Sequence, residues 1–280
     1  MKKKNQSILY SSPYLVWSLI FIIFPLLIVL FFSFTQKTGD SYSFTFANFE
    51  RLFDITYMKV FGLSLYLAAI STFLCLLIGY PLAYFVSKLG EKRRNLIITL
   101  MILPMWMNFL LRTYSWMAIL GNNGIINTLL SKIGLSKLNL LYNNGAVLLG
   151  MIYNFLPFMI LPIYTVLIKM DKDLINAASD LGATRWQTFK KIILPLSVPG
   201  IASGITMVFM PAVTTFVISR LLGGGQYMLV GNLIEQQFTT MDDWNFGSAL
   251  SIFMIIIILI SMAIMSKYDK DSKEGGGNIC

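Results

Sequence analysis

The stretch from Asp171 to Pro195, DKDLINAASDLGATRWQTFKKIILP, decides how the rest of the chain is interpreted. It is polar and basic, yet it lies between two long apolar runs. Its 25 residues far exceed an ordinary connection, whose median length is about 4–6 residues. A segment of this length and polarity indicates a structured element on the aqueous side of the molecule.

The pattern inside this stretch predicts a helix, a corner and a second helix. Asp173 is the expected N-cap of a helix beginning at Leu174, and Gly182 is expected to end it in the left-handed conformation. Thr184 and Gln187 form a capping-box pattern that starts the second helix. The small and apolar residues of the first helix share one face: Leu174, Ala177, Ala178 and Leu181. The spacing alone leaves two interpretations open, a surface helix that covers the bundle and a face that binds a partner.

Composition places the chain among membrane proteins. Of its 280 residues, 56% are hydrophobic and 12% are charged, against about 25% charged residues in soluble domains. Histidine is absent, which removes the commonest general base and metal ligand. Cys75 lies in an apolar run and Cys280 is the last residue, a pattern that predicts neither a disulfide framework nor a metal site.

Six apolar runs predict an all-α membrane protein with six transmembrane helices. The expected spans are 14–34, 60–86, 96–120, 145–168, 196–219 and 247–266. The predicted organisation is an N-terminal tail (1–13), a first span (14–34), a five-helix transmembrane domain (60–266) that includes the loop 171–195, and a C-terminal tail (267–280). A secretory signal peptide is the alternative for the first run, but this run is too long and no Ala-x-Ala-like site follows it.

Basic residues predict the orientation. With the N-terminus inside, fifteen of the 22 Lys and Arg residues fall in cytoplasmic segments and seven elsewhere. Both termini and the stretch 171–195 are therefore expected in the cytoplasm, and the net charge of +9 reflects topology rather than nucleic-acid binding.

Two function classes that a polytopic membrane protein could have are disfavoured. An intramembrane enzyme would need a catalytic set, yet no Asp or Glu lies centrally in a predicted span. A secondary transporter built on inverted repeats is disfavoured because no strong internal repeat is present. The chain also lacks the G-x-x-x-x-G-K-[ST] pattern, so any nucleotide must be bound by another polypeptide.

The stretch 171–195 resembles the EAA loop of binding-protein-dependent ABC importer permeases. That pattern is Glu-Ala-Ala, three residues, Gly, nine residues and Ile-x-Leu-Pro, and the matching residues here are Ala177, Ala178, Gly182, Ile192, Leu194 and Pro195. Asn176 stands in place of the Glu, which puts a Glu-specific ion pair in doubt; Asp180 is nearby but not equivalent.

The resemblance implies a type I ABC importer permease fold in a bacterial inner membrane. It implies that the loop docks on a dimer of a cytoplasmic ATPase, which binds ATP-Mg, so that the chain itself needs no cofactor. It further implies a second, similar permease chain and an extracytoplasmic binding protein as partners.

Other stretches resemble the polyamine (spermidine/putrescine) branch of this family. They are LPMWMNFLLRTYSW (103–116), SRLLGGGQYMLVGNLIEQQF (219–238) and FTFANFERLFD (44–54). Permeases for iron, sulfate and phosphonate share the loop and remain alternatives. A path for a polyamine should offer carboxylates and aromatic faces. The candidates for the path or a gate are Trp106, Asn108, Arg112, Tyr114, Trp116, Glu235, Asp242, Asp243 and Trp244, although Trp and Tyr also gather at membrane interfaces without contacting substrate.

Asn108 and Arg112 are expected on one helix face inside an apolar span, where polar groups are expensive. An arginine would repel a polycation, so Arg112 is predicted to pair with a carboxylate or hold a gate rather than bind the substrate.

Overall fold

The structure, a computed structural model, describes residues 13–38 and 41–274. The predicted N-terminal tail, apart from Pro13, and residues 275–280 with Cys280 lie outside the described residues. The described chain forms two compact units, which divide between Lys59 and Val60, between Asn232 and Leu233, and between Ile257 and Ile258. We call them unit 1 (the N-terminal part with 233–257) and unit 2 (60–232 with the end of the last helix).

The prediction of a six-span helical protein is confirmed. Five helices are long and apolar enough to cross a membrane, and a bent helix pair makes six if it is one span. The five are Pro13–Ser33, Ile55–Ser87, Asn144–Lys169, Arg185–Thr214 and Trp244–Ala263, and the bent pair is Glu91–Trp106 with Phe109–Lys132.

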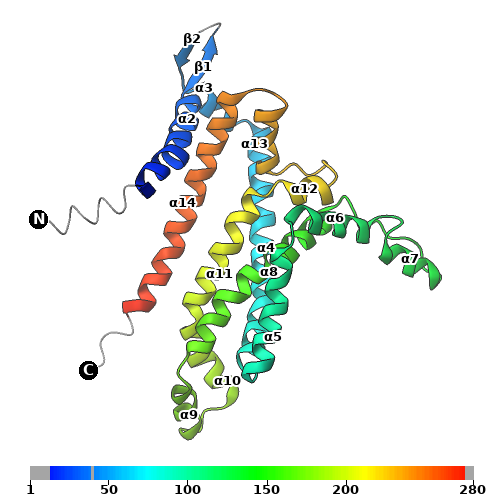
Figure 1. Cartoon of the computed structure of the whole chain (residues 1–280), viewed down its shortest axis with the longest axis vertical. Helices are drawn as coiled ribbons and strands as arrows, with labels where there is room; N and C mark the ends of the chain where they lie inside the picture. Colours follow the sequence, from blue (N-terminus) through cyan, green and yellow to red (C-terminus); the bar gives the residue numbers. More distant parts are fainter. Residues whose placement is uncertain (1–12, 39–40, 275–280) are drawn as a thin grey trace, which may run out of the picture. The chain divides into compact units, whose positions relative to one another are not determined.

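Unit 1 contains a β-hairpin that the sequence did not predict (Figure 1). Its elements are the π-helix η1 (Leu19–Ile23), α2 (Phe24–Ser33), β1 (Thr35–Thr38), β2 (Ser41–Phe44), α3 (Ala47–Leu52), the end of α13 (Val230–Thr239) and the start of α14 (Trp244–Glu274). The strands pair antiparallel, with Thr35 opposite Phe44. The ring of Phe34 stacks on Phe44 at 5.8 Å, so aromatic contacts fix the hairpin against the end of α2.

Unit 2 is a helical bundle. Its elements are α4 (Ile55–Ser87), α5 (Glu91–Ile102), the 3₁₀-helix η2 (Leu103–Trp106), α6 (Phe109–Leu120), α7 (Ile125–Lys132), α8 (Asn144–Lys169), α9 (Lys172–Asp180), α10 (Arg185–Thr188), the π-helix η3 (Phe189–Ile193), α11 (Leu194–Thr214) and α12 (Val217–Leu222). Helices α8 and α11 run side by side (Figure 1). A Cβ on Gly79 or Gly204 would lie 3.1 Å or less from atoms of buried Met159, so these two glycines allow the helices to pack closely.

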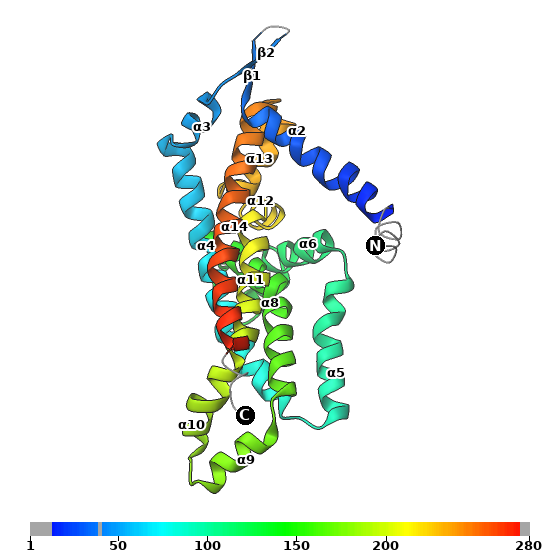
Figure 2. The same ribbon diagram turned by 90° about the vertical axis from the view of Figure 1, so that its left-hand side faces the viewer.

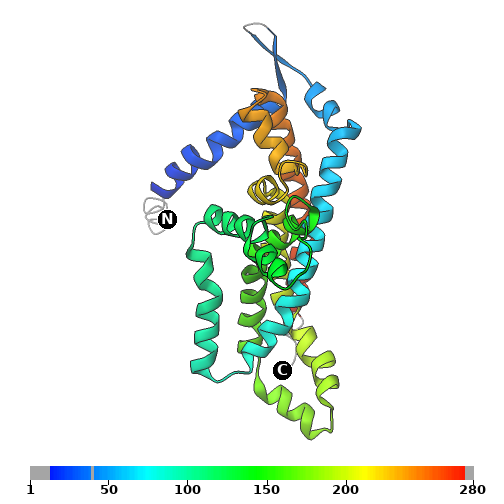
Figure 3. The same cartoon turned by 90° about the vertical axis from the view of Figure 1, so that its right-hand side faces the viewer.

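The third predicted span is not one straight helix. It breaks at Met107 and Asn108, where the two helical parts meet at 95° (Figures 2 and 3). The segment 121–144, between the third and fourth predicted spans, contains helix α7.

Two other helix ends differ from the ends of the predicted spans. The fifth span ends at Thr214 instead of Ser219, because Thr215 and Phe216 leave the helical conformation before α12. The last helix continues past residue 266 as far as Glu274.

Both π-helical turns precede a proline. The N–H of Phe24 bonds to the carbonyl of Leu19, and the N–H of Leu194 bonds to that of Phe189. Pro25 and Pro195 follow directly and supply no N–H. The wide turn lets each helix continue through the proline instead of ending there.

Candidate functional site

The segment 171–195 forms the predicted helix, corner and helix at one end of unit 2 (Figure 2). The first helix, α9, begins at Lys172, two residues earlier than expected. Its N-cap is Asp171 and not Asp173, since the Asp171 carboxylate accepts a hydrogen bond from the N–H of Asp173 (2.9 Å). Asp173 lies in the first turn, where a negative charge favours the helix dipole.

Gly182 makes the corner, as predicted. Its φ is +79°, a value that glycine adopts without a Cβ penalty. The N–H of Gly182 bonds to Ser179 O (2.9 Å) and the N–H of Ala183 bonds to Ala178 O (3.0 Å). These two bonds form a Schellman motif, which satisfies carbonyls at the end of α9.

The second helix begins with the predicted capping box. Thr184 Oγ1 accepts from the N–H of Gln187, and Gln187 Oε1 accepts from the N–H of Thr184 (2.8 Å). From Arg185 the chain is helical through η3 and α11 to Thr214, 30 residues in all. A displacement at the corner would therefore be carried along one continuous helix.

The predicted apolar face of α9 is largely uncovered. Leu174 is 48% exposed and Leu181, at the end of the helix, is 88% exposed, whereas Ala178 is buried. A helix that merely covered the bundle would bury its leucines. The other residues predicted to couple to the ATPase differ in solvent exposure. Ile192 and Leu194 are half-buried, and the exposed ones are Asn176, Ala177, Asp180, Gly182 and Pro195.

The candidates of the third span lie around the break. Trp106, in η2, is 84% exposed. Asn108 was expected inside a straight helix with Arg112, but it is the N-cap of α6, and its carbonyl accepts the N–H of Arg112 (3.2 Å). Its Oδ1 accepts from the N–H groups of Leu110 (2.8 Å) and Leu111 (3.4 Å).

Arg112 is buried in α6, and no carboxylate pairs with it in the described part of the chain. Its Nε has no hydrogen-bond partner there, and its guanidinium lies 5.9 Å from the ring centre of Phe109. Tyr114 is exposed, and Trp116 packs edge-on against Tyr153 (5.2 Å).

The remaining candidates belong to unit 1, so the two groups of predicted path residues fall in different units. Glu235 lies in α13. Asp242 has φ +52° and accepts a hydrogen bond from Trp244 Nε1 (2.8 Å).

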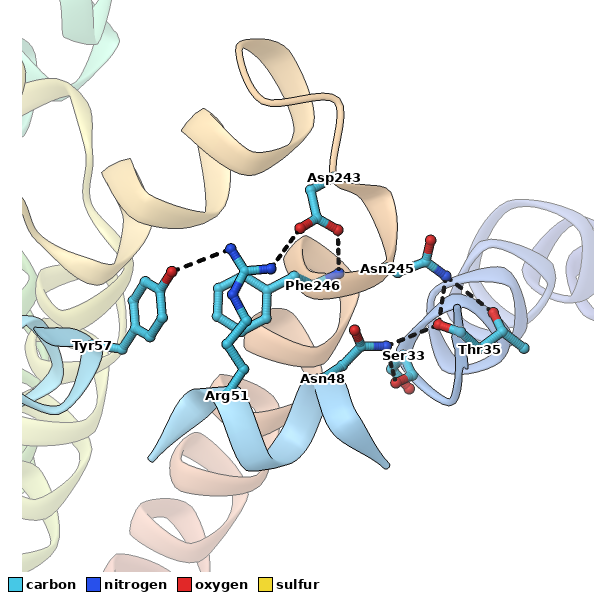
Figure 4. Close-up of polar contacts among 8 residues, drawn as sticks. All are labelled: Ser33, Thr35, Asn48, Arg51, Tyr57, Asp243, Asn245 and Phe246. Carbon is cyan, nitrogen blue, oxygen red and sulfur yellow. Dashed lines mark hydrogen bonds and ion pairs between the residues drawn. The ribbon is translucent and has the colours of Figure 1, made fainter. Parts of the chain in front are cut away.

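Asp243 belongs to a polar network that sequence reasoning missed (Figure 4). One oxygen pairs with Arg51 Nη1 (2.8 Å), and the other accepts from the N–H of Phe246 (3.0 Å) at the start of α14. Arg51 also donates to Tyr57 Oη (3.3 Å), and its guanidinium lies 4.0 Å from the ring centre of Phe246. Burial opposes the charge of Arg51, but the hydrogen bonds with Tyr57 and Asp243 outweigh it and raise the pKa of Arg51.

Two asparagines converge on Thr35 in a second group of polar contacts in unit 1 (Figure 4). Asn48 Nδ2 donates to Thr35 O (2.9 Å), and Asn245 Nδ2 donates to the same oxygen (2.7 Å). Asn48 also reaches Ser33 O (3.2 Å). These bonds join α3 and the start of α14 to the end of α2, so they hold unit 1 together.

This convergence predicts non-additive mutations. Asn48→Ala and Asn245→Ala should each cost about 0.5–1.5 kcal/mol, because the buried Thr35 carbonyl keeps one donor. The double variant should cost about 1–3 kcal/mol more than the sum, since the carbonyl then has neither donor. Unfolding of the purified chain in detergent, followed by circular dichroism, measures these costs. Strict additivity would show that the two side chains act independently.

The fold and the exposed corner define the class of the chain: a multi-pass membrane protein built on the permease plan of ABC importers. The chain belongs to the family described as binding-protein-dependent transport system inner membrane component, which matches residues 75–273. It is accordingly a component of a transport system.

Two relatives are similar along most of their length. The spermidine/putrescine transport system permease protein PotB of Haemophilus influenzae is 40% identical over 259 residues, which cover 91% of this chain and 91% of the relative. PotB of Escherichia coli K12 is 39% identical over 253 residues, with coverage of 89% and 92%.

A solved structure has the same fold. A chain of a bacterial ABC transporter that imports the acidic polysaccharide alginate superposes with a TM-score of 0.78, at 21% identity, covering 97% of this chain and 96% of that one. A second structure of a bacterial alginate transporter contains its periplasmic protein bound to an alginate pentasaccharide and matches with the same TM-score.

Proposed function

We propose that this chain is a permease subunit of an ATP-driven importer for polyamines of the spermidine and putrescine class. The observation that carries the proposal is the 40% identity to a spermidine/putrescine permease over 91% of both chains.

The proposed path suits a flexible polycation. Trp106, with its exposed indole, offers a face for cation–π contact with a protonated amine. The Asp243 carboxylate forms an ion pair with Arg51, and the Asp242 carboxylate accepts a hydrogen bond from Trp244. Both acids therefore stabilise the loop between α13 and α14 before any substrate binds. Arg112 would act as part of a gate, since its positive charge would repel the cargo.

The proposed energy coupling rests on the uncovered face of α9. Leu174 and Leu181 would enter a groove of a cytoplasmic ATPase, which binds ATP-Mg, and α10 to α11 would pass its motion into the bundle. Asn176 supplies an amide instead of a carboxylate at this contact. This arrangement places both chain ends and the loop 171–195 in the cytoplasm, in keeping with the distribution of Lys and Arg.

The proposal needs two further partners, a second permease chain and an extracytoplasmic binding protein. The alginate transporter of similar fold has been seen with its periplasmic protein, which supports a partner of that general kind.

Transport by the reconstituted assembly tests the proposal. We expect radiolabelled spermidine or putrescine to enter proteoliposomes that contain the chain, its cognate second permease and its ATPase, only when ATP is inside and the binding protein is outside. Uptake of iron, sulfate or phosphonate in place of polyamines would contradict the substrate. Ion-driven uptake by this chain alone would contradict the ABC mechanism.

A further inference from the structure

A basic cavity of about 490 Å³ lies in unit 2, apart from the uncovered face of α9. It is formed where the ends of α4 and α8 meet the starts of α5 and α9 (Figure 3). Three cations line it, namely Lys88 after α4, Arg94 on α5 and Lys172 on α9. No Asp or Glu lines it.

The positive charge of this cavity is uncompensated. None of the three cations forms an ion pair in the part of the chain that the structure describes. The Arg94 Nε is buried and has no hydrogen-bond partner there. Lys88 lies over the ring of Tyr84 at 4.1 Å, a contact that leaves its charge in place. A buried donor without an acceptor and three like charges in one cavity favour the binding of an anion.

The nearby acids do not neutralise the cavity. Asp171 precedes Lys172, but its carboxylate caps α9 through the N–H of Asp173. Glu91, on α5 before Arg94, is not part of the lining. The cations are therefore available to a ligand from outside the chain.

The rest of the lining indicates which anion fits. Leu167, Ile168 and Ile193 give the cavity an apolar wall beside its cations. A free phosphate ion would leave this wall unused, whereas the glycerol and first acyl carbons of a phospholipid would cover it. Basic pockets between transmembrane helices at the cytoplasmic side bind anionic headgroups, and arginine suits phosphate oxygens through paired N–H donors.

We propose that this cavity, lined by Lys88, Arg94 and Lys172, binds the phosphate headgroup of an anionic phospholipid. The bound lipid would link α9 to α4, α5 and α8 at the membrane surface. The polyamine is excluded from this site, because three positive charges repel a polycation.

Adjacent arginines provide a matched test. Arg94→Gln and Arg93→Gln each remove one positive charge from the same turn of α5, but only Arg94 lines the cavity and Arg93 is exposed. Native mass spectrometry of the full-length chain measures retention of phosphatidylglycerol against phosphatidylcholine. We expect wild type and Arg93→Gln to retain phosphatidylglycerol selectively, and Arg94→Gln to bind it about fivefold or more weakly.

Three results would overturn the proposal. They are equal retention of the two lipids, equal losses in the Arg93 and Arg94 variants, and full displacement of phosphatidylglycerol by millimolar inorganic phosphate, which would identify a free-anion site. If Arg94→Gln does not fold, Lys172→Gln must weaken binding in its place, and Arg94→Lys must retain part of it. Displacement of the lipid by the partner ATPase in the assembled complex would be a fourth result against the proposal.

Discussion

Gly182→Trp is expected to abolish ATP-driven uptake while the chain still inserts into the membrane. The corner glycine has φ +79°, and a Cβ there would meet no atom within 4 Å, so an indole would project from the corner beside exposed Leu181. It would stand between α9 and the proposed ATPase groove. If the indole makes the binding free energy between this chain and the ATPase less favourable by only about 1.4 kcal/mol, the affinity falls tenfold. Uptake into proteoliposomes and ATPase co-purification measure the two effects.

Gly134→Trp is the matched control, because Gly134 also has φ +79° and open space around its Cβ position. It lies just after α7, between the third and fourth predicted spans, so the predicted orientation puts it on the side of the membrane opposite to the segment 171–195. Both variants carry the same backbone strain, of about 1–2 kcal/mol for a side chain in the left-handed region. Normal uptake in Gly182→Trp, or equal losses in both variants, would refute the docking role of the corner.

The corner could be predicted because its hydrogen bonds are local. The capping box and the Schellman motif join residues at most five apart, so the residue types at Gly182, Thr184 and Gln187 carry nearly all the information. The error at the N-cap has the same origin. Asp171 and Asp173 are both good caps, and only the extended backbone at Asp171 selects the first.

The sequence around the break in the third span contains residues that favour a helix end, but an analysis of hydropathy alone does not detect them. The run is apolar throughout, which favours one long helix. Asn108, however, can bond to the N–H groups two and three residues ahead, and this competes with helix continuation. Pro104, which forms the 3₁₀ turn, also weakens the preceding turn.

The polar network around Arg51 and Asp243 could not be predicted from the sequence, for a different reason. Arg51 and Asp243 are 192 residues apart, and each lies outside the predicted spans near other charged residues. No local preference chooses one pairing among them. The hairpin β1–β2 was missed likewise, because its strands are only four residues long and are fixed by contacts of Tyr42 with Phe31 and Phe32 of α2.

Gly200→Leu is expected to prevent stable packing of α8 against α11. A Cβ at Gly200 would lie 3.0 Å from the Ile163 Cα and from the Pro162 carbonyl oxygen. These are backbone atoms, which cannot move aside as a flexible side-chain end does. Overpacking typically costs about 1–3 kcal/mol, and we expect the upper end or more here because the two helices must separate. Size-exclusion profiles and thermal unfolding in detergent measure the loss.

Gly62→Leu is the control that distinguishes the effect of helix packing from the effect of helix propensity. Gly62 lies within α4, where a Cβ would meet no atom within 4 Å. Leucine favours a helix over glycine by about 1 kcal/mol, so this variant should be as stable as wild type or more so. The same propensity gain is present in Gly200→Leu, and any net destabilisation there must come from contact with α8. If both leucine variants unfolded at the wild-type temperature, the close approach of α8 and α11 would not be what holds unit 2 together.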